Sequence, residues 1–190
     1  FQVTASAPMA GPYSLSEAMV DQILDGTPYP SPMYLPFTLL AYNEIYGLFD
    51  DLGEVFVAPW DEVAPPLFNG EHTMHAINAQ LPAVPRDMLQ PAFIAALEGD
   101  PHHPLRQALQ ANDAFTGWRP QAPVRLHHCV GDDQVAHANA ERAMAHFEAE
   151  GVATVDLASL PFGDHNACAP PALYFGKMWF DELRDAAVPA

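Results

Sequence analysis

Two acidic residues and one histidine, each placed after a predicted strand, are the residues of this chain best suited to catalysis. Asp132 and Asp133 follow the apolar run 124–130, and His165 follows the run 152–158. A carboxylate fixes the tautomer of a neighbouring imidazole, which then acts as a general base and a general acid near neutral pH. The spacing therefore predicts the last two members of a nucleophile–histidine–acid triad.

The two adjacent aspartates leave a choice of acid. We favour Asp133, because Val135 follows it at a spacing that is usual around such an acid, and Asp132 remains the alternative. A solvated, aspartate-rich turn would contain the same residues. The catalytic interpretation therefore depends on the joint order of strand, acid, helix, strand, histidine and helix.

The elements that would position these side chains form a strand–helix–strand–helix pattern. Segments 124–130 and 152–157 predict strands, and short connections between such elements are typical of a parallel sheet with right-handed crossovers. Asp133 and His165 should then lie on the same rim, at the carboxyl ends of the strands. Two helices accompany the strands: 136–150, with Ala140, Ala143, Met144 and Phe147 on one face, and 170–183, with Leu173, Gly176, Phe180 and Leu183 on one face.

The rest of the chain predicts one further strand and a helical insertion. Residues Phe1–Ala10 alternate like a strand, which Gly11-Pro12 ends. Residues 12–120 lack strand alternation and predict short helices separated by prolines and glycines, at 15–24, 36–48, 71–79, 90–97 and 104–110. We therefore expect a core made of 1–11 and 121–190, interrupted by a helical insertion at 12–120.

The two cysteines of the chain flank the candidate acid and histidine. If the strands at 124–130 and 152–157 are neighbours, the sulfur atoms of Cys129 and Cys168 lie at the same end of the sheet. They predict either a disulfide, which we favour, or two buried free thiols. A disulfide would indicate a periplasmic or extracellular protein.

Composition and charge exclude several classes of partner. The chain has 24 acidic and 7 basic residues and a net charge of −17, whereas a nucleic-acid partner would require a basic face. No apolar stretch reaches the roughly 18 residues that a membrane span requires. The histidine pairs, such as His72 with His75, lack carboxylate or cysteine partners at a recognised spacing, so we predict neither a metal site nor a cofactor.

The nucleophile of the expected triad is missing from these residues. No Gly-x-Ser-x-Gly turn occurs in the 190-residue sequence, which opens in what resembles the middle of a strand. We therefore expect the serine to lie upstream of Phe1. The N-terminal part of the same protein would then be the partner that completes the site.

Three segments carry a resemblance to a known family. They are Ala7-Pro8-Met9-Ala10-Gly11-Pro12-Tyr13-Ser14-Leu15, Pro28-Tyr29-Pro30-Ser31-Pro32-Met33-Tyr34-Leu35-Pro36 and Leu39-Leu40-Ala41-Tyr42-Asn43-Glu44-Ile45-Tyr46-Gly47. They resemble secreted bacterial lipases and esterases of the α/β-hydrolase fold, in the lipase/prolyl-oligopeptidase-like group that includes cell-wall-degrading esterases. The resemblance spans most of the chain and implies the C-terminal portion of such an enzyme.

This resemblance implies a function for each part of the chain. Asp133 would be the acid and His165 the base of a serine esterase or lipase, and 12–120 would be a cap or lid over the site. The substrate would be a small-molecule or cell-wall ester, cleaved through an acyl-enzyme without a cofactor by a secreted or periplasmic protein. The alternatives are a non-catalytic ligand-binding domain of the same fold, and a peptidase or other acyl transferase.

Overall fold

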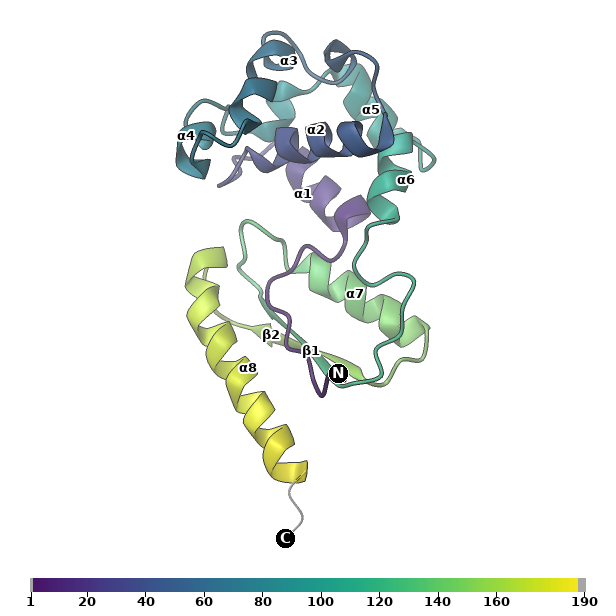
Figure 1. Cartoon of the computed structure of the whole chain (residues 1–190), viewed down its shortest axis with the longest axis vertical. Helices are drawn as coiled ribbons and strands as arrows, with labels where there is room; N and C mark the ends of the chain where they lie inside the picture. Colours follow the sequence, from purple (N-terminus) through teal and green to yellow (C-terminus); the bar gives the residue numbers. More distant parts are fainter. Residues whose placement is uncertain (1, 188–190) are drawn as a thin grey trace. The chain divides into compact units, whose positions relative to one another are not determined.

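The computed structural model describes residues 2–187, which form two compact units. The first unit combines Phe1–Met19 with Asp113–Ala190, and the second is Val20–Asn112 (Figure 1). Phe1 and residues 188–190 lie outside the described part. The second unit is shorter at both ends than the predicted cap at 12–120.

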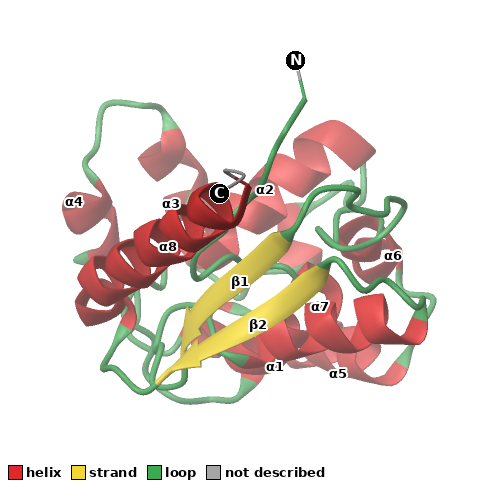
Figure 2. Cartoon of the chain, turned by 90° about the horizontal axis from the view of Figure 1, so that it is seen from below, coloured by secondary structure: helices red, strands yellow, loops and turns green. Residues whose placement is uncertain are grey.

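The first unit is built on a parallel pair of strands. Strand β1 (Val124–Cys129) pairs with β2 (Val155–Leu160) in a register that runs from Val124↔Val155 to Cys129↔Leu160. Helix α7 (Ala138–Ala149) connects them. Figure 2 shows the two strands side by side and ending at the same edge. The predicted parallel sheet with a helical crossover is confirmed.

The segment before residue 11 pairs with β1 as an interrupted third strand. It makes isolated parallel bridges, Ser6↔Val124 and Met9↔His127, in place of the continuous strand predicted over Phe1–Ala10. The nitrogen of Pro8 carries no hydrogen and cannot donate to a neighbouring strand. Its carbonyl still accepts from the backbone nitrogen of His127 at 2.9 Å, so the segment stays against β1.

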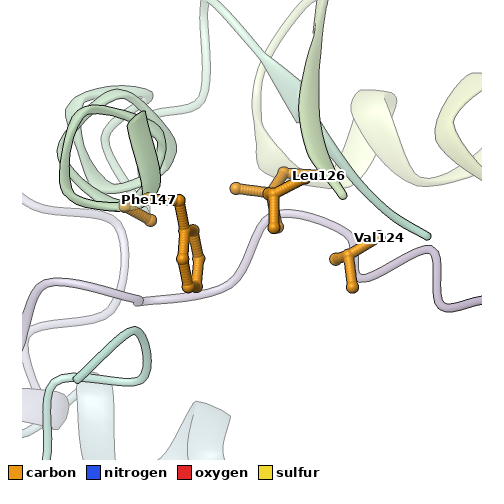
Figure 3. Close-up of a cluster of buried hydrophobic side chains, with 5 residues drawn as sticks. Val124, Leu126 and Phe147 are labelled. Atoms are coloured by element: carbon orange, nitrogen blue, oxygen red, sulfur yellow. The ribbon is translucent and has the colours of Figure 1, made fainter. Parts of the chain in front are cut away.

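One face of the sheet packs against α7. Ala143 and Phe147 of the helix join Val124 and Leu126 of β1 and Val155 of β2 in a buried cluster. Figure 3 shows the Phe147 ring directed from the helix toward Leu126. The predicted apolar face of this helix is confirmed, and burying a side chain of this size contributes about 1.5–3 kcal/mol.

The other side of the sheet packs against α8 (His165–Ala187). Cys168 and Ala172 of this helix lie buried against Cys129 and Leu160. Helix α8 also lies close to the segment before residue 11. At Gly176, an added Cβ would lie 2.6 Å from Cε of Met9.

The prediction for this helix was wrong in two respects. Leu173 and Phe180 were expected on the packed face, but they are 62% and 41% exposed. The helix also begins at His165, before the predicted start at residue 170, because the Asp164 side chain accepts a hydrogen bond from the backbone nitrogen of Ala167 at 2.9 Å. An aspartate at this position satisfies a donor of the first turn and stabilises the earlier start.

The second unit contains helices and turns but no named strand among its described residues. Its elements are α1 (Val20–Leu24), α2 (Tyr34–Tyr46), α3 (Trp60–Val63), α4 (Met74–Asn78), α5 (Pro91–Gly99) and α6 (Pro104–Gln110), with short 3₁₀ turns at Leu52–Glu54, Pro65–Phe68 and Pro85–Met88. Val55, Phe56 and Met88 are fully buried in it. Across residues 2–187, no helix is long and apolar enough to cross a membrane.

A buried aspartate ties together the two points where the chain leaves and re-enters the first unit. Before the insertion, a π-helical turn (Leu15–Met19) contains Ser16. Its backbone nitrogen donates to Oδ1 of Asp113 at 3.0 Å, and its hydroxyl donates to Oδ2 at 2.6 Å. The contact joins residues that are 97 positions apart in the sequence, so it closes the insertion at its base.

Replacing Asp113 with alanine is expected to lower the free energy of unfolding by about 2–3 kcal/mol, because two buried donors of Ser16 lose this acceptor. Urea unfolding followed by tryptophan fluorescence measures the loss. Asp113→Asn keeps one acceptor oxygen and should lose about half as much. Equal stability of wild type and Asp113→Ala would contradict the structural role of this contact.

Candidate functional site

Asp132 and His165 meet at the carboxyl edge of the two strands. Asp132 lies in the turn after β1, and His165 is the first residue of α8, shortly after β2. The Nδ1 atom of His165 lies 2.8 Å from Oδ2 of Asp132. The aspartate side chain is fully buried, whereas 32% of the histidine side chain is exposed. The Asp132 carboxylate is therefore shielded from solvent, whereas solvent can reach the imidazole of His165.

The two aspartates make different contacts with His165. Asp133, the favoured acid, accepts a hydrogen bond from the backbone nitrogen of His165 at 3.1 Å, whereas the carboxylate that binds the ring belongs to Asp132. Asp132 contacts the ring because a tight turn, in which its backbone nitrogen donates to the carbonyl of Cys129 at 3.2 Å, directs its side chain inward. A turn of this kind depends on backbone geometry that residue types do not reveal.

Four groups surround the carboxylate of Asp132. Its Oδ1 accepts from the backbone nitrogens of Gln134 at 3.0 Å and Val135 at 2.8 Å, and its Oδ2 faces His165 and, at 3.5 Å, His128. Burial raises the pKa of Asp132, but the hydrogen bonds from His128, Val135 and His165 outweigh burial and hold this pKa below its usual value. The carboxylate is therefore ionised near neutral pH.

An ionised Asp132 determines which nitrogen of His165 carries the hydrogen. A carboxylate only accepts, so Nδ1 of His165 is the donor in the 2.8 Å contact. The second nitrogen, Nε2, then carries a lone pair on a ring that solvent can reach. The ring can take a proton at Nε2 from a hydroxyl within hydrogen-bond distance, which is the requirement for a general base.

A disulfide joins the two loops that carry this pair. Cys129 at the end of β1 and Cys168 in the first turn of α8 are bonded, with 5.8 Å between their Cα atoms. The favoured prediction of a disulfide is confirmed, and the alternative of two free thiols is excluded. The same loops approach closely at Gly131, where an added Cβ would lie 3.1 Å from the carbonyl oxygen of Gly163.

Replacing both Cys129 and Cys168 with alanine is expected to lower the free energy of unfolding by about 4 kcal/mol. The cysteines are 39 residues apart, and the bond restricts the unfolded chain over that length. Urea unfolding of the double variant under oxidising conditions measures the effect. Adding a reductant should destabilise the wild type and leave the variant unchanged, and an equal response of both proteins would contradict the prediction.

The adjacent histidines of β1 point to opposite faces, as expected for a strand. His127 is buried, and its Nδ1 lies 3.1 Å from the carbonyl oxygen of Arg125. Burial lowers the pKa of His127. His128 contacts the carbonyl of Val135 through Nε2, but its buried Nδ1 has no hydrogen-bond partner in the described chain.

A serine, a histidine and a glutamate that were not predicted as a group also lie in contact, the histidine between the other two. The hydroxyl of Ser159 is 2.9 Å from Nε2 of His137, and Nδ1 of His137 is 3.3 Å from Oε1 of Glu141. Ser159 lies within β2, whereas the nucleophile of a hydrolase occupies a sharp turn between a strand and a helix. The Glu141 side chain is 63% exposed, so solvent screens the attraction between its charge and the imidazole of His137.

The sequence finds no match among protein-family models or curated proteins. Solved structures do match. A rice cell wall degrading esterase, LipA from Xanthomonas oryzae, has a TM-score of 0.78 and 25% identity, with 97% of this chain and 50% of LipA covered. A hydrolase candidate from Legionella pneumophila has a TM-score of 0.84 and 24% identity, with 100% and 50% covered.

A more distant structure has the same fold. Candida antarctica lipase A matches with a TM-score of 0.62 and 13% identity, over 98% of this chain and 43% of the lipase. The likenesses to the Legionella protein and to this lipase are evidence for the fold alone. The chain spans about half the length of LipA.

Proposed function

We propose that this chain, which has the esterase- and lipase-like α/β-hydrolase fold and corresponds to its C-terminal portion, supplies the acid and the base of a carboxylic-ester hydrolase. The 2.8 Å contact between Nδ1 of His165 and Oδ2 of Asp132 is the observation that carries this proposal. Asp132 takes the role for which the sequence favoured Asp133. The similarity to LipA, a cell wall degrading esterase, supports an ester as the bond that is cleaved.

The proposed reaction passes through an acyl-enzyme. A serine outside residues 1–190 attacks the ester carbonyl, and Nε2 of His165 takes the proton of its hydroxyl. Backbone amides hold the negatively charged oxygen, and the protonated ring then gives its proton to the leaving alcohol. Water then attacks the acyl-enzyme in the same way, with His165 as the base, and releases the carboxylic acid and the free serine. Asp132 holds the ring in the required tautomer and stabilises its positive charge in both steps. The reaction needs no cofactor.

We further propose that another part of the same protein covers the apolar surface of the first unit. A groove of about 1000 Å³ runs along residues 2–8 and β1, with Val3, Phe115 and Trp118 among its lining side chains. Val3 and Trp118 are exposed, as are Leu173 and Tyr174 on α8. An apolar groove and exposed apolar side chains are features of surfaces that another segment covers.

The second unit is proposed to act as a cap or lid that contacts the substrate. Within this unit, α2 exposes Tyr34, Phe37 and Ile45, which follow the helical repeat along one side. An exposed apolar stripe suits the acyl part of an ester. The disulfide between Cys129 and Cys168 supports a secreted or periplasmic location, where such bonds persist.

A fluorophosphonate probe tests the proposed nucleophile. Incubation of the full-length protein should attach one phosphonyl group, and mass spectrometry of its peptides should find that group on a serine outside residues 1–190. The Ser159→Ala variant should be labelled to the same extent as wild type. Loss of labelling in this variant would assign the nucleophile to Ser159, and no labelling of the wild type would favour a non-catalytic binding domain.

A further inference from the structure

A second histidine lies directly behind the Asp132–His165 pair. His128, on β1, has a fully buried side chain. Its Nε2 lies 2.8 Å from the carbonyl oxygen of Val135 and 3.5 Å from Oδ2 of Asp132. A carbonyl oxygen only accepts, so Nε2 of His128 carries a hydrogen that points toward both oxygens.

These contacts connect three residues, Asp132, Val135 and His128, each of which touches the other two. Val135 donates its backbone N–H to Oδ1 of Asp132 at 2.8 Å and accepts the N–H of His128 on its carbonyl at 2.8 Å. His128 in turn faces the other carboxylate oxygen, which is the one that binds His165. A rotation of the Asp132 carboxylate would break its contact to Val135 as well as its contact to the imidazole of His165.

Packing holds the ring of His128 in this orientation. Tyr13 contacts it edge-on with 6.5 Å between ring centroids, and His137 does so from another element at 5.6 Å. Nδ1 of His128 has no hydrogen-bond partner among residues 2–187. Turning the imidazole of His128 over would bury its N–H donor without the acceptor at Val135, which is unfavourable.

We infer that His128 is a positioning residue, which fixes the Asp132 carboxylate for its hydrogen bond to His165. The inference rests on the proposed function and deepens it. Since the side chain of His128 is fully buried behind Asp132, its removal should lower kcat and leave KM nearly unchanged.

Two substitutions separate the N–H donor from the bulk of the ring. His128→Gln places an amide N–H the same number of bonds from Cα as Nε2, whereas His128→Leu fills the space and removes the donor. We expect His128→Leu to lower kcat for a p-nitrophenyl ester by about 10- to 100-fold, because small displacements of a catalytic group have effects of this size. His128→Gln should keep kcat within about threefold of wild type.

His127→Leu is the matched control, since it replaces a buried histidine of the same strand whose ring faces the carbonyl of Arg125 instead of Asp132. It should retain the wild-type kcat. A kcat of His128→Leu within about threefold of wild type, or an equal loss in His127→Leu, would overturn the inference.

A second readout does not depend on catalysis. The ¹⁵N chemical shifts of the His165 ring, measured by NMR in the full-length protein, should show hydrogen on Nδ1 in wild type and His128→Gln, and a mixture of tautomers in His128→Leu. If wild type cleaves no ester, the proposed function fails, and these shifts still decide the role of His128. An unchanged tautomer in His128→Leu would overturn that role. If this variant does not fold, His128→Asn, whose amide stops one bond short of Val135, replaces it in both measurements.

Discussion

Replacing His165 with alanine is expected to lower kcat for ester hydrolysis by the full-length protein on the order of 10⁶-fold, because the proposed acceptor of the proton from the attacking hydroxyl is removed. KM should change far less, since the ring contributes chiefly to the transition state. Initial rates with a p-nitrophenyl ester over a range of concentrations measure both constants. The exposed ring of His165, with Nε2 directed away from Asp132, is the structural basis of the expectation.

Chemical rescue distinguishes a catalytic loss from a folding defect. Imidazole added to His165→Ala should restore part of the rate, because it can occupy the space of the missing ring and accept the proton. The exposed His102 is a matched control, and His102→Ala should keep the wild-type rate. A kcat of His165→Ala within about tenfold of wild type would contradict the role of this residue as the base.

Replacing Asp132 with asparagine is expected to lower kcat by about 10⁴-fold. The amide keeps the shape of the side chain but removes the charge, and its NH₂ group, if it faces His165, favours the tautomer with hydrogen on Nε2. That tautomer cannot accept a proton from the nucleophile. The loss should be smaller than for His165→Ala, because the base remains in place. The same steady-state assay measures it.

The neighbouring variant Asp133→Asn is the control that separates the two aspartates. Asp133 accepts a hydrogen bond from the backbone nitrogen of His165, and an asparagine oxygen can replace that contact. Its kcat should therefore stay within about tenfold of wild type. If Asp133→Asn were the variant with the large loss, the favoured choice made from the sequence would be right and the assignment to Asp132 would be wrong.

Local patterns were sufficient to predict the framework of the site. The alternation of apolar strands with a helix indicated the parallel arrangement of β1, α7 and β2, because short connections leave few other topologies. The spacing of Ala140, Ala143 and Phe147 indicated the buried face of α7. Parallel strands end at one edge, so the histidine, an aspartate and the two cysteines were expected together. All of these predictions depend on periodicity and chain order.

Other features depended on contacts between residues far apart in the sequence. The Asp113–Ser16 contact, 97 positions apart, closes the base of the insertion near Met19 and Asp113, inside the predicted limits of 12 and 120. The packed face of α8 includes Ala172, Gly176 and the buried Trp179, whereas Leu173 and Phe180 remain exposed. Of the residues named from the sequence for this face, Gly176 lies in the contact.

The sequence by itself determined the fold class, the catalytic histidine candidate and the cysteine pair, because these follow from element order and from residue chemistry. Only the tertiary structure decided between Asp132 and Asp133 as the ring contact. The turn from Cys129 to Asp132 directs the Asp132 carboxylate toward the imidazole of His165, whereas the Asp133 carboxylate accepts from the backbone nitrogen of His165. Adjacent residues of the same type differ only in the direction of their side chains, and backbone geometry sets that direction.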